Sequence, residues 1–499
     1  MRFRALGLTL VLLVPATAAD LEQARQAQQE LYAARFEKAA ELYAGLVKAD
    51  PSWALGYEGW VRALLGARHA TAAYAAADAA NTAVPGTAAA ETAIGLASFR
   101  RGEIVESERN FRRAIQIDRT HAEALMGLAR VLSAISMFKT ARELRKAAYQ
   151  SAPDDPECIL AGLADEQKGA EHIATLERVL AIYDPESRQA RQLRAHIASD
   201  QAVGDRTLRR LTSPYKHYDV KLQTVLDARK GRRGLSVRVE INQKKFDLLL
   251  DTGASGISIS PRAAKKAGLD GLGDETSEAR GIGDKAPLDR RLLLASEVRI
   301  GDLTFADVPI SAFAQSGSLN VDDGLIGADF FGRFLVDLDL VHGKMSLDPF
   351  GQPPPEVAGD SGNSLPAGFT RAFRIGNHLS LMTAVNGNRG NLFLLDTGSS
   401  SNLIDAAVAR ETSKTYGDDL TKLRGIQGTV DKVRRAERVE LMFAGFRQEN
   451  PDLLAFDMSR MSDDIGVRLS GILGMPVLGL LRVTIDFREG AVRLEHIKP

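Results

Sequence analysis

The stretch FDLLLDTGASGIS, residues 246–258, is an apolar run that stops at an aspartate and continues in small polar residues. A second stretch, LFLLDTGSSSNLI at residues 392–404, repeats this pattern. Glycine follows closely in both, and glycine in a strand interior weakens the strand. We therefore expect two buried strands that each end by presenting a carboxylate, Asp251 in the first and Asp396 in the second.

Three further features follow each Asp-Thr-Gly in the same order. The first is a glycine-bearing segment, ARGIGDKAP from Ala279 and LRGIQGTVD from Leu423. The second is an apolar-apolar-glycine step, in DGLIGADFF from Asp323 and SGILGMPVL from Ser470. The third is a strand hairpin, LVDLDLVHGKMSLD and RVTIDFREGAVRLE. The repeat in order and spacing predicts a duplicated β domain.

The halves are expected at residues 215–348 and 367–499, because β-branched and alternating segments begin near residue 215. Residues 349–366 between them include GQPPPEVAGDSGNSLP and are interpreted as a linker, because proline and glycine punctuate regular structure. A linker this short favours pairing of the two halves within one chain, since it gives them a high effective concentration. Pairing between chains remains the alternative.

These residues resemble the aspartic protease family, in its retropepsin-like and pepsin-like forms. The resemblance implies an all-β pseudo-dimer of two retropepsin-like halves, in which Asp251 and Asp396 form the catalytic pair. Implied support for the pair comes from Thr252, Gly253, Thr397, Gly398 and Ser399. The implied flaps, which would close over a peptide or protein substrate, contain Gly281, Ile282, Gly283, Gly425, Ile426 and Gly428. Neither flap carries the tyrosine typical of pepsin.

The chemistry explains why two carboxylates must meet. Peptide hydrolysis without a metal or a covalent intermediate needs a water between two carboxyl groups, one accepting a proton and the other donating one. Carboxylates about 3 Å apart cannot both ionise, so they share a proton and their pKa values separate. Glycine at 253 and 398 is expected to allow close approach and unusual dihedrals, and its amide can donate to the carboxylate.

Simpler interpretations exist for single motifs. Asp251 or Asp396 alone is also compatible with capping the helix predicted after it, as aspartate often does, and the flap glycines are also compatible with plain hairpin turns. Capping explains neither the duplication nor the companion segments. The residue after the motif is Ala254 in one half and Ser399 in the other. A hydroxyl donor would favour a charged Asp396 and leave Asp251 as the acid.

The first half of the chain is different in kind. Between residues 20 and 200 the sequence has helical periodicity, and Pro51, Pro85 and Pro153 fall at multiples of 34 residues. Small residues recur in that register (Ala39, Ala73, Ser107 and Ala141, then Ala80, Ala114 and Ala148), and bulky Tyr43 and Phe111 share another position. The segment resembles a tetratricopeptide array of about four hairpins followed by one irregular helix pair.

Such an array implies a concave groove for a protein partner, and a helical spacer or self-association arm is the alternative. The residues expected to carry out hydrolysis all follow residue 215. We therefore expect the array to be dispensable for cleavage of short peptides.

Composition excludes several classes of protein. Lys+Arg and Asp+Glu both total 64, so no net field attracts nucleic acid. Eight histidines lack a spacing such as His-Glu-x-x-His, so neither a metal nor another cofactor is expected. No Gly-x-Ser-x-Gly elbow is present, and the single cysteine, Cys158, lies in the helical segment and excludes an internal disulfide.

Residues 1–19 have two arginines, a short apolar run and a small-residue end, the pattern of a cleaved signal peptide. The apolar run is too short for a membrane anchor, since a spanning helix needs about 20 residues. The sequence thus predicts an exported aspartic endopeptidase, periplasmic or extracellular, with an Asp251/Asp396 dyad and a docking array. The alternative of another class is a binding scaffold whose protease-like part is an inactive peptide clamp.

Overall fold

The computed structural model describes residues 18–164, 169–227, 231–279, 281–284, 288–313, 323–351, 365–417, 421, 423–425, 428–430 and 432–498. Nearly all of the expected signal segment, residues 352–364 of the expected linker, and Ile426 of the second expected flap lie outside these residues. Within the described ranges, no helix combines the length and the apolarity needed to cross a membrane.

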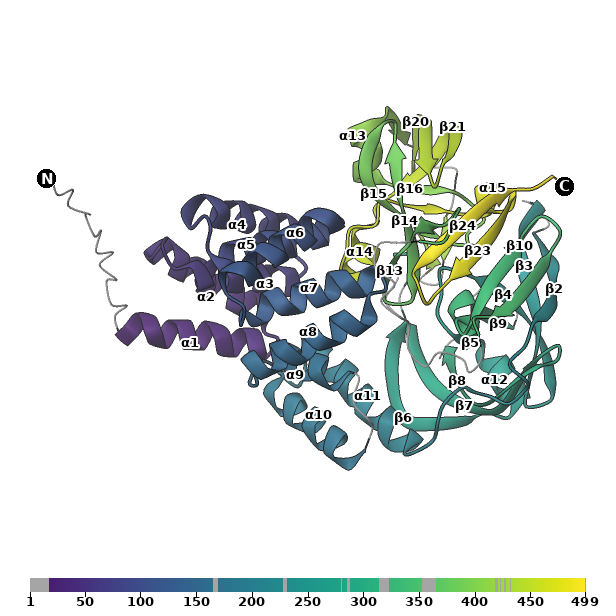
Figure 1. Ribbon diagram of the computed structural model, residues 1–499, viewed down its shortest axis with the longest axis horizontal. Coiled ribbons are helices and arrows are strands. Elements are labelled where there is room, and N and C mark those ends of the chain that lie inside the picture. The colour runs from purple at the N-terminus through teal and green to yellow at the C-terminus, as the bar shows by residue number, and fades with distance from the viewer. Residues whose placement is uncertain are drawn as a thin grey trace, which may run out of the picture.

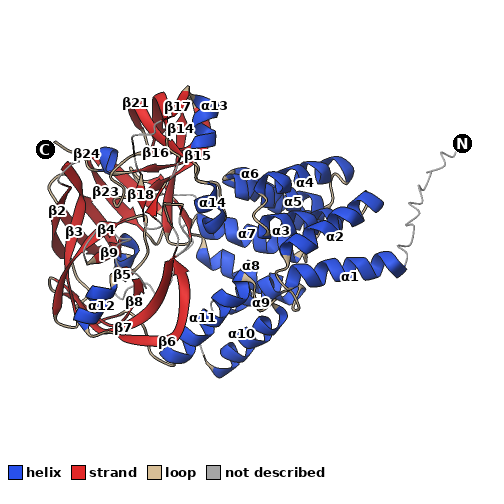
Figure 2. Ribbon diagram, turned by 180° about the vertical axis from the view of Figure 1, so that it is seen from behind, coloured by secondary structure: helices blue, strands red, loops and turns tan. Residues whose placement is uncertain are grey.

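Helices make up the described chain up to residue 203 and form one body beside the strands (Figures 1 and 2). They are α1 (Ala18–Tyr32), α2 (Phe36–Ala49), α3 (Ala54–Gly66), α4 (Ala70–Ala83), α5 (Ala88–Arg101), α6 (Ile104–Ile117), α7 (Ala122–Ala134), α8 (Phe138–Ser151), α9 (Pro156–Leu163), α10 (Ala170–Ile182) and α11 (Arg188–Val203). The second helices of successive hairpins begin at Phe36, Ala70, Ile104 and Phe138, a constant step of 34 residues. The tetratricopeptide-like period is therefore confirmed.

Packing inside the array explains the recurring residue types. The side chain of Phe111 is fully buried, and a Cβ at Gly127 would lie 2.2 Å from its ring. A Cβ at Gly59 would likewise lie 2.3 Å from the ring of Tyr43. The seven small residues of the predicted register are all fully buried: Ala39, Ala73, Ala80, Ser107, Ala114, Ala141 and Ala148. Close approach of paired helices requires small residues at these places.

The end of the array differs from the expectation. Three helices, α9, α10 and α11, follow the four hairpins instead of one irregular pair. Asp155 caps α9, accepting from the amides of Glu157 and Cys158, and Pro156 opens the helix. α9 has only eight residues and leads to α10, while α11 runs on to Val203.

The first β half contains β1 to β11. Its elements are β1 (Arg210–Leu211), β2 (Tyr218–Asp227), β3 (Gly231–Ile241), β4 (Lys244–Asp251), β5 (Ile257–Ile259), α12 (Pro261–Ala267), β6 (Asp270–Ala279), β7 (Leu288–Ile300), β8 (Leu303–Phe313), β9 (Gly324–Gly327), the 3₁₀ helix η1 (Ala328–Phe331), β10 (Phe334–Asp339) and β11 (Lys344–Pro349).

The second β half contains β12 to β24. Its elements are β12 (Thr370–Arg371), β13 (Phe373–Ile375), β14 (His378–Val385), β15 (Asn388–Leu395), β16 (Leu403–Asp405), α13 (Ala406–Thr412), β17 (Thr415–Gly417), β18 (Arg424–Gly425), β19 (Gly428–Thr429), β20 (Arg434–Phe443), β21 (Phe446–Phe456), α14 (Ser459–Ile465), β22 (Gly471–Leu473), α15 (Met475–Leu478), β23 (Leu481–Asp486) and β24 (Ala491–His496).

The two halves repeat one strand topology. In the first, β4 pairs in parallel with β9, and β5 pairs antiparallel with β9 and parallel with β8. In the second, β15, β22, β16 and β21 make the same three pairings. The duplication inferred from the motifs is therefore present in the fold.

The closing hairpins of the two halves pair in one sheet, while most strands of the second half form a separate sheet. β10 pairs antiparallel with β23, with Leu338 opposite Val483 and Val336 opposite Ile485. All four side chains are buried in a single apolar cluster that contains residues of both halves. The halves thus pair within one chain, as the short linker favoured.

The helical array packs against the protease-like part. Apolar side chains of the second half, including Phe373, Ile375, Leu392 and Val467, share a buried cluster with array residues. Each of these four is at most 9% exposed, and each large apolar side chain buried from water contributes about 1.5–3 kcal/mol. Removing the array would expose this surface. The expectation that the array is dispensable for short peptides stays a prediction, and a deletion variant would have to tolerate this exposed surface.

Charged contacts line the same interface, where α14 meets the array. Arg68 Nη2 lies 2.9 Å from Asp464 Oδ1, and Arg100 forms an ion pair with Asp463. The Arg468 amide donates to the Arg100 carbonyl at 2.7 Å. A cavity of about 380 Å³ lies here, and Arg100 and Asp463 are among its lining residues. On the other side, α11 packs against β6 of the first half.

Candidate active site

The two Asp-Thr-Gly turns lie where equivalent strands end. Asp251 is the last residue of β4 and is paired with Gly327 of β9. Asp396 directly follows β15, and its amide donates to the Leu473 carbonyl of β22 at 3.0 Å. Each buried strand therefore delivers one carboxylate to the junction of the halves, as the sequence predicted.

Two threonines lock the turns to each other. Thr252 Oγ1 donates to the Leu395 carbonyl at 2.8 Å and accepts from the Thr397 amide at 3.0 Å. Thr397 Oγ1 donates to the Leu250 carbonyl at 2.7 Å and accepts from the Thr252 amide at 3.1 Å. Both side chains are buried. The four bonds form a symmetric crosslink, the arrangement that the family resemblance implied.

Glycine is required here by close approach. A Cβ at Gly253 would lie 2.8 Å from the carboxyl carbon of Asp396, and one at Gly398 would lie 2.6 Å from that of Asp251. Each glycine thus packs against the opposite carboxyl group. Neither has a positive φ, so at these positions the close approach is what demands glycine.

The carboxyl groups are bonded to amides and to each other. The Gly253 amide donates to Asp251 Oδ1 at 2.9 Å, and Asp396 Oδ1 accepts from the amides of Gly398 and Ser399 at 2.8 and 2.9 Å. A side-chain hydrogen bond connects the two carboxyls. Such a bond between two acids requires a shared proton.

Burial and proximity raise both pKa values, but unequally. Removal from water, then repulsion by Asp396, then the hydrogen bond between them raise the pKa of Asp251 well above its usual range, although the amides of Gly253 and Ala254 oppose that rise. Burial also raises the pKa of Asp396, but the hydrogen bond from Asp251, the two amides and the nearby His378 oppose that rise. The rise in pKa is therefore greater for Asp251, and the two carboxyls share one proton and titrate as a unit.

The expected role of the Ser399 hydroxyl is not observed. Ser399 Oγ donates to the Ser401 carbonyl at 2.8 Å, and only the backbone amide of Ser399 bonds Asp396. A hydroxyl has one proton to donate, so it cannot also donate to the carboxylate. The Ser399 hydroxyl therefore causes no difference between the two acids, and the assignment of Asp251 as the acid stays a prediction.

The capping interpretation is excluded. Helix α12 is capped by Ser260, whose side chain accepts from the Ala263 amide, and α13 is capped by Asp405. Asp251 and Asp396 cap neither helix, and both remain directed at the junction between the halves.

Glycines on the neighbouring strands leave room for the turns. A Cβ at Gly327 would lie 2.5 Å from the Ala254 carbonyl oxygen, and one at Gly474 would lie 2.8 Å from that of Ser399. The apolar-apolar-glycine steps therefore serve the close approach that the sequence indicated.

Further side chains support the first turn. Asp329 accepts from Ser255 Oγ and from the Gly256 amide, both at 2.8 Å. Asn377, from the second half, donates to Ser255 Oγ at 2.6 Å. These residues lie 73 to 122 positions apart in the chain, and no motif in the sequence connects them.

The second turn has a different support. Asn402 Oδ1 accepts from the Gly474 amide at 2.9 Å, and its amide nitrogen donates to Gln448 Oε1 at 3.2 Å. The position equivalent to Asn402 in the first half is Ile257, so this contact has no counterpart there.

The two flap segments contact each other. Gly425 and Gly428 pair across the β18–β19 hairpin, and Asp284, next to Gly283, donates its amide to the Thr429 carbonyl at 3.3 Å. A Cβ at Gly425 would lie 2.4 Å from the Ile282 carbonyl oxygen, so only glycine permits this contact.

The first flap segment also reaches the body of the second half. Ile282 packs against a buried apolar cluster that includes Leu423, Val430 and Phe456. Gly283 has φ +130° and Gly428 has φ +93°, conformations that glycine adopts readily. Gly281 lies in the same described segment, 281–284.

Among the described residues, the group of histidine and carboxylate side chains spaced for a metal ion lies in α10 and α11, away from the two turns.

The comparison with protein families agrees with this geometry. The family model of aspartyl proteases matches residues 237–330 and 381–477, and each match contains one Asp-Thr-Gly and one apolar-apolar-glycine step. The resemblance of both halves to aspartic proteases is thus confirmed.

A retropepsin-like aspartic protease of known structure from Rickettsia conorii is similar to part of this chain, with 19% identity and a TM-score of 0.20. The match covers 28% of this chain and 96% of that one. The comparison with curated proteins found no match.

Proposed function

Proceeding from the two aspartyl protease matches, we propose that the chain is an aspartic endopeptidase that hydrolyses peptide bonds with the Asp251/Asp396 pair. The observation that supports this most directly is the close packing of each turn's glycine on the opposite carboxyl, held by the symmetric crosslink of Thr252 and Thr397. An inactive fold would have no need to keep both acids in this costly buried arrangement.

The first chemical step follows from the charge states. Asp396, the carboxylate, accepts a proton from the attacking water, while the hydroxide oxygen forms a bond to the peptide carbonyl carbon. Asp251 gives its proton to the carbonyl oxygen, which prevents an oxyanion from forming. The product is a neutral tetrahedral diol.

The second step reverses the proton movement. The diol loses a hydroxyl proton to Asp251, the C–N bond breaks, and the leaving amine takes the proton held by Asp396. The pair returns to its singly protonated state. No group other than the two acids and water needs to supply a proton.

The flap segments would cover the bound peptide in this mechanism. Ile282 would contact substrate side chains, because its apolar surroundings in the second half suit an extended peptide with apolar residues. Excluding water strengthens the electrostatic interactions within the site.

Export is part of the proposal, on the basis of residues 1–19 alone. Amino-terminal sequencing of the mature protein from a secreting host tests it: a chain that begins near residue 20 is expected, and a chain that retains residue 2 contradicts it.

A docking role for the array is also proposed, supported by its repeated helix pairs. Leu55 on α3 is 55% exposed and Val105 on α6 is 64% exposed, which suits an apolar partner. Leu55→Glu should slow cleavage of a protein substrate while cleavage of a short peptide stays unchanged. Equal rates on the protein substrate would contradict docking at this site.

The direct test of the proposed activity is digestion of a peptide library by the full chain at several pH values, analysed by mass spectrometry. Internal cleavage that depends on pH is expected. Intact peptides at every pH, together with measurable peptide binding, would instead establish the non-catalytic clamp.

A further inference from the structure

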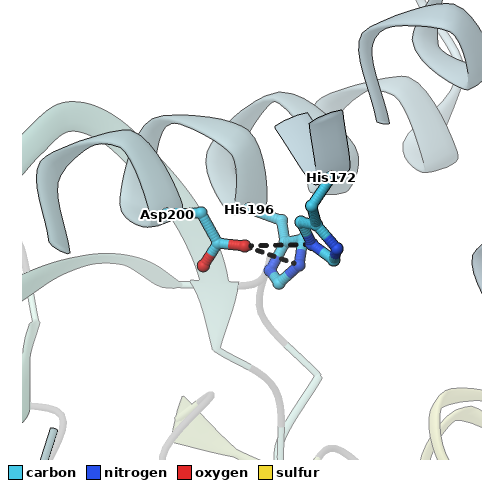
Figure 3. Close-up of side chains that lie close together, drawn as sticks. All are labelled: His172, His196 and Asp200. Carbon is cyan, nitrogen blue, oxygen red and sulfur yellow. Dashed lines mark ion pairs between the residues drawn. The ribbon is translucent and has the colours of Figure 1, made fainter. Parts of the chain in front are cut away.

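Three side chains at the end of the array converge on one point (Figure 3). His172 lies in the first turn of α10, while His196 and Asp200 lie four residues apart on α11. Residues at this spacing share one face of a helix. One donor atom from each of the three lies within 4.8 Å of the other two.

The separations fit ligands around a metal ion better than hydrogen bonds. Asp200 Oδ2 is 3.6 Å from His172 Nε2 and 3.4 Å from His196 Nε2. A hydrogen bond from nitrogen to oxygen spans about 2.7–3.2 Å. Tetrahedral bonds of about 2.1 Å place ligand atoms about 3.4 Å apart, whereas octahedral bonds of that length give about 3.0 Å. The observed spacing matches the tetrahedral case.

His172 provides an independent indication. Its residue is 8% exposed, and both ring nitrogens are buried without a hydrogen-bond partner. An imidazole always carries at least one N–H donor when no metal is bound, so leaving both nitrogens unpaired is unfavourable. One of the two, Nε2, is directed at Asp200 (Figure 3). A metal ion bound there would satisfy it.

We propose that His172, His196 and Asp200 bind a divalent transition-metal ion of the zinc type. Two imidazoles and one carboxylate are ligands that zinc accepts, and three protein ligands leave a fourth position for water. The side chain of His196 is 51% exposed, so ion entry is open on that side and its ring is free to complete the geometry.

The position of the site suggests what bound metal does. It would join α10 to α11, and α11 packs against β6, the strand that precedes the first flap segment at 281–284. A bound ion would therefore stabilise the end of the array that contacts the first protease-like half. It takes no part in the proposed hydrolysis, because the two turns are elsewhere.

The sequence predicted no metal because its histidines lack the spacing of known zinc motifs. The available signal was His196-x-x-x-Asp200 on a predicted helix, and the third ligand is 24 residues upstream. Only the antiparallel packing of α10 on α11 brings His172 to the other two.

The test uses the full chain, freed of metal with a chelator and titrated with Zn²⁺ by calorimetry. One high-affinity site is expected, with an upward shift in Tm on zinc addition. Co²⁺ should give the intense visible absorption of a tetrahedral site. His196→Ala removes a half-exposed ligand without disturbing the core and should weaken zinc binding at least about tenfold.

His217→Ala is the matched control. His217 also lies near two carboxylates, 2.6 Å from Asp348 and 3.2 Å from Asp219, but on an exposed surface and at hydrogen-bond distances. This variant should bind zinc like the wild type. The proposal would be overturned if the wild type did not bind zinc. It would also be overturned if His196→Ala and His172→Ala both bound zinc as the wild type does.

Discussion

The turn at Asp251 and the turn at Asp396 share their central hydrogen bonds but are supported from different sides. Thr252 and Thr397 exchange equivalent bonds of 2.7–3.1 Å. Around the first turn the support is the carboxylate of Asp329, and around the second it is the amide of Asn402. The symmetric part fixes where the two carboxyls lie, while the side chains that support each turn differ between the halves.

The largest expected effect tests the symmetric part. Asp251→Asn and Asp396→Asn should each lower kcat/KM at least about 1,000-fold, because each removes one member of a shared-proton pair while keeping its shape. Assays on one peptide, with circular dichroism to verify folding, measure this. The control Asp247→Asn alters a half-exposed carboxylate paired with Arg238 and should change kcat/KM less than about twofold. If either variant kept its activity, Asp251 and Asp396 would not act together as a catalytic pair.

Much of this arrangement was predictable because the signals are local or periodic. The Asp-Thr-Gly turns, their glycines and the 34-residue step are each read from short segments. The supports of the turns were not predictable, because Asp329, Asn377 and Asn402 meet their partners through the tertiary fold. The same holds for the packing of the array on α14, where charges of ordinary appearance, such as Arg100 and Asp463, prove to be partners.

A second prediction concerns the two glycines. Gly253→Ala and Gly398→Ala would each place a Cβ within 2.8 Å of the opposite carboxyl carbon. Overpacking of this kind costs about 1–3 kcal/mol in the free energy of unfolding, and the displaced carboxyl should lower kcat/KM about 100-fold. Denaturant titration and peptide assays check both.

Gly45→Ala is the control for these substitutions. Gly45 lies in α2 with no atom within 4 Å of an added Cβ, so alanine there should stabilise the protein by about 0.5–1 kcal/mol. If one of the dyad glycines tolerated alanine as Gly45 should, the close approach would be asymmetric and the comparison of the halves would need revision.

A third prediction tests the asymmetric part through stability. A carboxyl whose pKa is raised in the folded state binds its proton more tightly there, so the free energy of unfolding falls as pH rises from the unfolded pKa, about 3.9, toward the folded pKa. Asn does not titrate. Asp251→Asn should therefore flatten the fall in Tm above about pH 4 and exceed the wild type near neutral pH.

Asp396→Asn gives the comparison. Hydrogen bonds oppose the rise in the Asp396 pKa, so this variant should flatten the same Tm profile less than Asp251→Asn does. Thermal unfolding of the three proteins between pH 4 and pH 8, at roughly one-unit steps, measures the difference. The reverse order would assign the proton to Asp396 and exchange the two roles in the proposed mechanism.

The smallest expected effect concerns Ser399 and Ala254, the residues that differ directly after the motif. The Ser399 hydroxyl donates to the Ser401 carbonyl, so Ser399→Ala should lower the free energy of unfolding by about 0.5–1.5 kcal/mol. It should change kcat/KM less than about threefold. In Ala254→Ser the equivalent acceptor is the Gly256 carbonyl, which already accepts from the Gly327 amide at 2.7 Å and has a second lone pair. Neither variant should move the pH profile of kcat/KM.

A hydroxyl that did reach a carboxylate would stabilise the anion, so Ser399→Ala would move the acid limb upward and Ala254→Ser would move the basic limb downward. Either shift would show that this residue, and not the burial of Asp251, sets the difference between the two turns.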